Sequence, residues 1–308
     1  MKKHAFLILI FLFLIENGFL LGIEEIESKT EAIDLLIESQ NPDGGWGYGF
    51  GKQSFTEPTA FVTLALSKCT HKKCQPAATD GTTWLLETQN PDGGWGMIGF
   101  GPSDINTAIA VYSLQSSQAA LLDRDLKVNV SIDRGINWLL NNRENHTLPP
   151  PISPITGGWA WTKGTYDFAE PTAYGIMGVS TKNTTDLTEA VKVLYDRQGS
   201  DGGWNVAKAN RSQLLQTAVI LTALKKANVT RSENITRALS YLEKRTGDMN
   251  TPLITAWSLI ALDSYESEKA SSVFEKLKSM HNKKGRFSNP YVIAIVMIAL
   301  ENHYDNEI

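Results

Sequence analysis

The sequence predicts an all-α protein, an (α/α)6 barrel (toroid) of six helical hairpin repeats, and three observations lead to this prediction. The octapeptide Gln-Asn-Pro-Asp-Gly-Gly-Trp-Gly at 40–47 recurs unchanged at 89–96, and looser copies end at Trp159 and Trp204. Each tryptophan is followed by a Thr-Ala dipeptide whose alanine lies 14, 13, 14 and 14 residues further on. Two kinds of helical segment alternate along the chain. Such regular spacing indicates one supersecondary unit copied along the chain.

Each unit contains an outer and an inner helix. The segment before a Gly-Gly-Trp is amphipathic, with apolar residues at helical spacing such as Ile33, Leu36 and Ile37, which suits an outer layer. The segment after it is apolar on every side and must be covered all round. These inner segments are 60–66, 108–114, 218–224, 256–262 and 291–300. A helical hairpin cannot bury an inner helix alone, so the units are expected to close into a barrel.

Proline and the dipeptides fix where the units begin and end. Glu57-Pro58 and Glu170-Pro171 open two inner helices, because proline is tolerated in the first helical turn. Two further units keep only the inner half, at Thr255-Ala256 and Ile293-Ala294. We therefore predict one domain over 28–302.

The amino terminus predicts export. Lys2 and Lys3 precede an apolar run over 5–15, which is too short to span a bilayer alone and is typical of a secretory signal. Apolar residues resume at 19–23, so residues 1–22 are either a signal peptide ending at Gly18 or Gly22 or an uncleaved anchor. The expected location is secreted or at the cell surface, with membrane contact only through this segment.

Sequons and cysteines fit an oxidising compartment. About three sequons are expected by chance from this composition, whereas the chain has six, at Asn129, Asn145, Asn183, Asn210, Asn228 and Asn234. Cys69 and Cys74 lie between two predicted helices, where they can form a disulfide. The alternatives are two free thiols or a metal site assisted by His71.

Composition excludes several function classes. The net charge is −4 and no basic run occurs, which argues against nucleic acid or anionic lipid as the main partner. Two cysteines and five scattered histidines lack the spacing of zinc ligands, so we expect no metal and no cofactor.

The Gln-x-x-Asp-Gly-Gly-Trp repeat with its Thr-Ala inner helix resembles the repeat of the squalene cyclases and protein prenyltransferases, whose fold is an α/α toroid. The resemblance covers about residues 28–302. It implies that the motif glutamines and tryptophans are scaffold, tying outer helices to neighbouring turns. By this resemblance the scaffold residues are Gln40, Trp46, Gln89, Trp95, Trp159, Gln198 and Trp204.

The catalytic motifs of that family are absent. Cyclases that protonate a polyene use Asp-x-Asp-Asp-Thr-Ala, with the second aspartate as general acid. The best local match, aligned on Thr107-Ala108, places Ile105 at the acid position. Such cyclases also pair two helical domains, and this chain has room for one. The zinc ligands of prenyltransferases and lanthionine cyclases and the thioester motif of complement-like toroids are missing as well.

The loops that lead into the inner helices should gather at one mouth of the barrel. They carry the candidate ligand-binding aromatics Tyr48, Phe50, Phe55, Phe100, Trp161, Tyr166 and Phe168. The same end presents the candidate catalytic carboxylates Glu57, Asp104 and Glu170. These acids either bind a ligand or act on one, or they only cap helix amino termini, where N–H groups and the helix dipole favour negative charge. A proline-rich insertion over 143–156 is expected on the same rim.

We therefore predict an exported toroid protein that binds a ligand or partner at its mouth without chemistry. The partner would be a small molecule, lipid, glycan or surface protein. The alternative is an isoprenoid or carbohydrate enzyme that uses the mouth carboxylates. A third hypothesis, a scaffold for envelope proteins, requires a flat apolar patch on the outer surface.

Overall fold

The computed structural model describes residues 29–117, 126–143, 156–182, 185–205, 211–284 and 289–307. The predicted signal over 1–22, most of the insertion over 143–156, and Asn145, Asn183 and Asn210 lie outside these residues. In the described part, helices are joined by loops, the longer of which, such as 39–55 and 88–105, lead into inner helices, and an isolated bridge between Trp204 and Gln213 is the one β pairing. None of these helices is both long enough and apolar enough to cross a bilayer.

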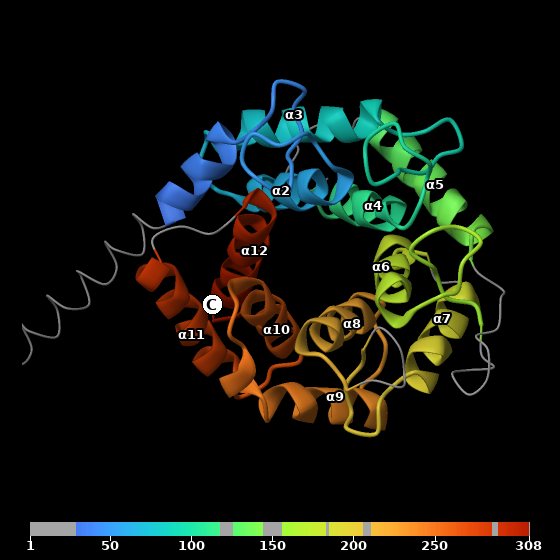
Figure 1. The fold of residues 1–308 in the computed structure, drawn as a ribbon, viewed down its shortest axis with the longest axis vertical. Coiled ribbons are helices and arrows are strands. Elements are labelled where there is room, and N and C mark those ends of the chain that lie inside the picture. The colour runs from blue at the N-terminus through green and yellow to red at the C-terminus, as the bar shows by residue number, and fades with distance from the viewer. Residues whose placement is uncertain are drawn as a thin grey trace, which may run out of the picture.

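Helices form two concentric layers (Figure 1). The outer layer consists of the helix over 29–38, α3 (Cys74–Glu87), α5 (Leu126–Asn141), α7 (Thr185–Asp196), α9 (Glu233–Glu243) and α11 (Ala270–Lys284). The inner layer consists of α2 (Thr56–Lys68), α4 (Asn106–Ser117), α6 (Ala169–Val179), α8 (Leu214–Lys226), α10 (Pro252–Ser264) and α12 (Pro290–Glu307). A short 3₁₀ turn, Thr246–Asp248, lies between the two layers in sequence.

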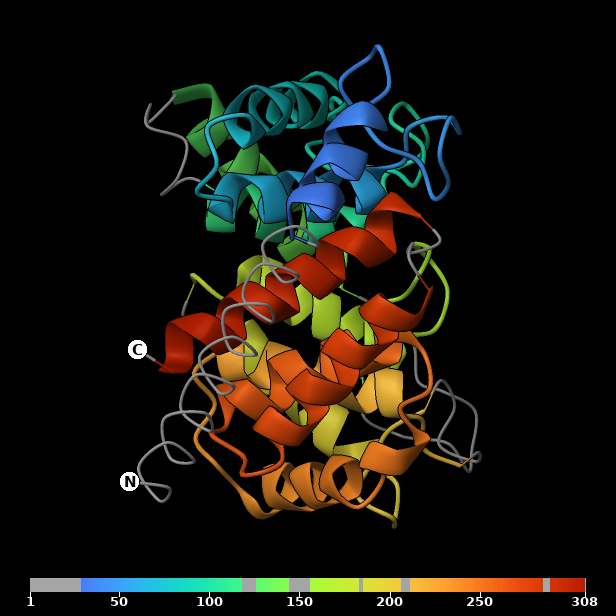
Figure 2. The same ribbon diagram turned by 90° about the vertical axis from the view of Figure 1, so that its left-hand side faces the viewer.

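The inner helices form a closed ring. Each contacts the next in chain order, and α12 contacts α2, so the last unit closes on the first (Figures 1 and 2). The fold is the predicted α/α toroid. Its last helix continues to Glu307, beyond the predicted domain end at 302.

The motif tryptophans pin each loop to its outer helix. The indole Nε1 of Trp95 donates to the carbonyl oxygen of Leu85 at 2.7 Å, while its backbone N–H donates to Thr107 Oγ1 at 2.8 Å. The same pair of bonds recurs at the other three motif tryptophans, Trp46, Trp159 and Trp204. All four indoles are almost completely buried. The Thr of each Thr-Ala dipeptide is therefore a capping partner of the motif, which explains their constant spacing.

The motif glutamines link neighbouring units. Gln89 Nε2 donates to Gly93 O at 2.8 Å within its own turn and to Ser131 O of the next outer helix at 2.9 Å. Gln40 and Gln198 make equivalent bonds to Ala77 and Asn234. The first glycine of each motif turn needs left-handed backbone: Gly93 has φ +94°, and a Cβ there would lie 2.8 Å from Arg134 O.

In unit three, different residues make the hydrogen bonds of the motif. Arg143 stands at the glutamine position, four residues after Leu139, and its Nε donates to Gly157 O at 2.9 Å. The motif aspartate is also missing, and Asp167 from the far side of the loop accepts the Gly158 N–H at 2.9 Å instead. Asp167 is completely buried and pairs with Arg197 at 2.6 Å.

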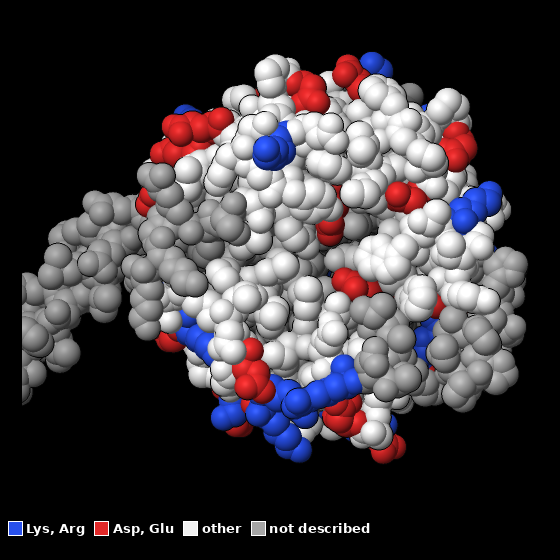
Figure 3. Space-filling model, in the orientation of Figure 1, with Lys and Arg blue, Asp and Glu red and all other residues white. Residues whose placement is uncertain are grey.

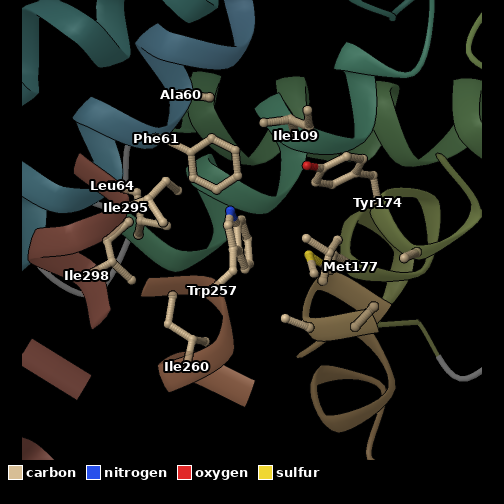
Figure 4. Close-up of a cluster of buried hydrophobic side chains, with 14 of the residues drawn as sticks. Ala60, Phe61, Leu64, Ile109, Tyr174, Met177, Trp257, Ile260, Ile295 and Ile298 are labelled. Atoms are coloured by element: carbon tan, nitrogen blue, oxygen red, sulfur yellow. The ribbon is translucent and has the colours of Figure 1, made fainter. Parts of the chain in front are cut away.

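The barrel centre is packed shut midway along its axis. Figure 4 shows side chains from different inner helices converging there, with Phe61, Tyr174, Met177 and Trp257 prominent among them. All four are at most 4 % exposed. The rings of Phe61 and Trp257 meet edge to face, with centroids 5.8 Å apart. These side chains form an aromatic layer at the barrel centre.

The structure joins Cys69 and Cys74 in a disulfide between α2 and α3. Of the three described sequon asparagines, Asn129 and Asn228 are exposed. Asn234 is partly buried, and its Nδ2, the atom to which a glycan attaches, donates to Gln198 Oε1 at 2.7 Å.

Candidate functional site

The three candidate carboxylates lie at the end of the barrel where the inner helices begin, hereafter the mouth. Glu57 lies in the first turn of α2, Glu170 in the first turn of α6, and Asp104 just before α4. Figure 3 shows acidic side chains around a hollow near the centre of this face.

Glu57 faces two phenols rather than the helix backbone. The Tyr48 hydroxyl donates to Glu57 Oε2, and Tyr291, at the start of α12, lies close enough to this carboxyl to lower its pKa. Among the described residues, no backbone N–H donates to it. Burial raises the pKa of Glu57, the phenols lower it, and the nearby charge of Glu170 raises it further; the net shift is upward. Among the described residues Glu57 therefore does not cap the helix by a backbone hydrogen bond, although it lies in the first turn of α2, where the helix dipole favours negative charge.

Glu170, in the first turn of α6, likewise bonds a side chain of the neighbouring inner helix. Its Oε2 accepts a hydrogen bond from Gln216 Nε2 of α8 at 3.3 Å, and burial raises its pKa. Gln216 is only 8 % exposed, and its Oε1 has no hydrogen-bond partner among the described residues. The Glu170–Gln216 pair thus leaves a buried acceptor beside the hollow.

Asp104 does cap a helix. Its Oδ1 accepts from both the backbone N and Nδ2 of Asn106, each at 2.8 Å. Burial still raises its pKa. The capping explanation holds for Asp104, which accepts a backbone N–H bond that neither glutamate accepts among the described residues.

Aromatic rings connect the glutamates to the barrel centre. Tyr48 contacts Phe55 and Tyr291, with ring centroids 5.1 and 6.1 Å apart, and Tyr291 contacts Phe61 at 5.6 Å. On the other side of the hollow Trp161 contacts Tyr174, at 6.3 Å. Burial holds the pKa values of Tyr174 and Tyr291 well above their ordinary value, so both remain neutral hydrogen-bond donors.

The other predicted aromatics do not join this cluster. Phe50, Phe100 and Tyr166 are exposed, Phe100 by 84 %, and none stacks on another described ring. Phe168 is partly buried and immediately precedes α6, where its backbone N–H donates to Trp159 O. The aromatic part of the site is therefore smaller than the sequence suggested.

Tyr291, Tyr174 and Gln216 were not predicted as site residues. The position of Tyr291 in its repeat unit could have identified it. Glu57, Glu170 and Tyr291 each stand two residues before the Thr-Ala or Ile-Ala dipeptide of their unit, the position of Ile105 in unit two. That offset is the one at which the cyclase motif carries its general acid. Alignment on unit two alone hides this correspondence.

A second hollow adjoins the glutamates. A pocket of about 510 Å³ beside Gln216 is flanked by Arg211 and Arg245. Arg245 stacks on the Tyr241 ring, 4.0 Å from its centroid, and neither arginine pairs with a described carboxylate. Figure 3 shows basic side chains gathered on this side of the mouth. The mouth thus offers acidic groups at its centre and cationic groups on one flank.

No group of three metal-ligating side chains occurs in the described part of the chain. The carboxyl, phenol and amide groups at the mouth can transfer protons and bind a ligand. Carboxyl groups with raised pKa values stay protonated nearer to neutral pH, which suits a general acid.

The raised pKa values of Glu57 and Glu170 predict that stability falls as pH rises. Between pH 4.5, the ordinary pKa of glutamate, and the raised pKa of the folded state, the folded protein binds more protons than the unfolded chain. The free energy of unfolding therefore falls as pH rises through this range. We expect Glu170→Gln to unfold at higher urea concentration than the parent at pH 7.5 and at the same concentration at pH 4. Glu87→Gln, on the exposed side of α3, is the control, and an equal shift in both variants would contradict the prediction.

Comparison with known families agrees with the fold. Residues 19–148 match the squalene-hopene cyclase C-terminal domain, and residues 171–292 match the prenyltransferase alpha-alpha toroid domain. No individual curated protein sequence matches the chain.

Solved structures share the architecture at low identity. A protein from Actinoplanes is 16 % identical with a TM-score of 0.65, over 91 % of this chain and 99 % of that one. A type II terpene cyclase from Scytonema, bound to geranylgeranyl dihydroxybenzoate, is 14 % identical with a TM-score of 0.66, over 91 % and 97 %. An alpha-amylase from Clostridium perfringens is 9 % identical with a TM-score of 0.66, over 90 % and 98 %.

The Scytonema comparison corrects one expectation. The single toroid of this chain covers 97 % of that cyclase chain, so the argument that a cyclase needs two helical domains is wrong. The two family models, in tandem on one closed ring of six inner helices, show that this chain belongs to the α/α-toroid superfamily of the squalene cyclases and protein prenyltransferases.

Proposed function

We propose that the mouth is an acid site that binds an isoprenoid-like substrate and donates a proton to it from Glu57. The observation that carries this proposal is the position of Glu57: it stands at the general-acid offset of the cyclase motif, accepts a hydrogen bond from Tyr48 and lies beside Tyr291. The enzyme alternative is thereby preferred to binding without chemistry.

The surroundings of Glu57 suit a proton donor. Burial keeps the carboxyl protonated, and the two phenols are placed to stabilise the carboxylate that forms when the proton leaves. Proton transfer to a trisubstituted alkene forms a C–H bond and breaks the O–H bond, leaving a tertiary carbocation. Loss of a proton from a neighbouring carbon to a carboxylate or water then gives an isomer of the substrate.

Aromatic faces below the glutamates suit the cationic intermediate. Three buried rings lie at the barrel centre, where their burial excludes water: Tyr174, Phe61 and Trp257. Ring faces attract a cation by up to about 2 kcal/mol or more when water is excluded. The flanking Arg211 and Arg245 would suit an anionic head group on the same substrate.

Deuterium incorporation tests this proposal. The full-length chain, incubated in D₂O with farnesol, farnesyl diphosphate or squalene, should convert at least one of them to an isomer that carries one carbon-bound deuterium, detected by mass spectrometry. A parallel incubation with malto-oligosaccharides tests the carbohydrate alternative through release of reducing ends. Binding of a prenyl compound without deuterated product, or reducing ends alone, would overturn the acid role towards isoprenoids.

We also propose that the protein is secreted or held at the cell surface, as the amino terminus predicts. The Cys69–Cys74 disulfide and the exposed Asn129 and Asn228 support this. Expressed through a eukaryotic secretory pathway, the chain should carry glycans at Asn129 and Asn228, but few at Asn234, whose Nδ2 is engaged by Gln198. Glycopeptide mass spectrometry measures occupancy at each site. An unglycosylated intracellular product would contradict the proposal.

A further inference from the structure

A second cavity lies at the opposite end of the barrel, where the inner helices finish. Its volume is about 510 Å³, within the range of small-molecule sites. The apolar wall consists of Phe61, Leu64, Trp257, Ile260, Ile295 and Ile298, contributed by α2, α10 and α12. None of the mouth carboxylates lines this cavity, although Phe61 and Trp257 are shared with the aromatic layer at the barrel centre.

The rim of this cavity carries two lysines without an anionic partner. Lys225 and Lys226 end α8 and line the pocket, and among the described residues no carboxylate pairs with either. Lys226 Nζ lies over the Tyr112 ring, 5.6 Å from its centroid, and Lys225 Nζ lies over Tyr265 at 5.3 Å. Tyr112 is itself part of the pocket wall, so the Lys226 ammonium lies at the pocket opening.

Two carboxyl groups, Asp263 and Glu266, also line this cavity. Asp263 is buried and hydrogen-bonded to His303 Nδ1 at 2.8 Å. Glu266 is exposed. Desolvation lowers the pKa of Lys226, because burial penalises its charged form. An anionic group at the rim would favour that form.

We propose that this cavity binds an anionic amphiphile, with its alkyl or prenyl chain against the Phe61–Trp257 layer and its carboxylate or phosphate head at Lys225 and Lys226. The site is independent of the proton donor at the mouth. Asn228 also lines this pocket, so a glycan there would lie at its opening.

Competition for a fluorescent anionic amphiphile tests the site, with the full-length chain produced without glycans. The competitors are dodecanoate, dodecyl phosphate and dodecan-1-ol, which share a chain and differ in the head. We expect one or both anions to bind at least tenfold tighter than the alcohol, and the better of the two identifies the head. Equal affinity of the alcohol and both anions would overturn the proposal.

Variants locate the binding. Lys225→Ala with Lys226→Ala should remove the preference for anions, whereas Arg211→Ala with Arg245→Ala, a matched loss of two cations at the mouth, should leave it. Ser264→Trp at the rim and Ile298→Trp in the wall should each abolish binding, and thermal unfolding shows which of them is folded. Glu57→Gln should bind as the parent does. Binding that persists in a folded pocket-filling variant, or that is lost with the mouth variants, would overturn the proposal without bearing on the acid chemistry.

Discussion

Replacing Glu57 with glutamine should lower the rate of substrate conversion by a factor of about 10² to 10⁴, the range that a positioned general acid contributes. Glutamine has nearly the same shape as glutamate and can accept a hydrogen bond from the Tyr48 hydroxyl, but it has no acidic proton to donate. Initial rates of deuterated product formation measure the effect. Asp104→Asn is the matched control: it alters a carboxylate at the same mouth that caps α4, and it should change the rate only a few-fold. Equal losses in the two variants would show that neither residue is the acid.

The pH dependence of this activity has a defined sign. Activity needs protonated Glu57, so the rate should be highest below the raised pKa of that carboxyl and fall as pH rises through it. Tyr48→Phe removes a hydrogen bond that lowers the pKa of Glu57, so this fall should move to higher pH. Glu170→Gln removes a negative charge that raises the pKa of Glu57, so the fall should move to lower pH. Shifts in the same direction would contradict the assignment of Glu57 as the titrating group.

The fold could be predicted because its signal is local and repeated. The Gln-to-Trp turn and the Thr that caps it lie within one unit, so Gln89, Trp95 and Thr107 carry their bonding pattern in sequence spacing alone. Ring closure also followed, since an inner helix with no polar face must be covered. Unit three was harder to predict from the sequence, because Arg143 and Asp167 replace the motif glutamine and aspartate and neither matches the repeat pattern.

The site was predicted only in part, because it is assembled by closure of the ring. Glu57 and Tyr291 belong to the first and last units, and only the α12–α2 contact brings them together. Whether a glutamate in a first turn caps its helix or faces the barrel axis depends on which phenols and amides lie across the mouth. The offset shared by Glu57, Glu170 and Tyr291 was present in the sequence, but comparison with a single unit did not reveal it.

Loss of the Asp167 carboxylate should destabilise the protein by about 3–5 kcal/mol, because it breaks a buried ion pair with Arg197. The two side chains are 0 % and 5 % exposed, and Asp167 accepts Arg197 N–H bonds through both its carboxylate and its carbonyl oxygen. Urea denaturation of Asp167→Ala measures the cost. Asp133→Ala breaks an exposed pair with Lys182 and should cost less than about 1 kcal/mol.

A triple variant separates the loss of charge pairing from damage to the loop. Units one and two hold an aspartate at the position of Thr156 and a serine at that of Asp167, and Thr88 occupies the position of Arg197. In unit two, Asp92 Oδ1 accepts the Gly94 N–H at 3.0 Å and the Ser103 hydroxyl at 2.7 Å. Thr156→Asp with Asp167→Ser and Arg197→Thr rebuilds this arrangement without a buried charge, so it should recover most of the stability lost in Asp167→Ala. If the triple variant is as unstable as the single one, the damage lies in the loop and the broken ion pair with Arg197 is not its cause.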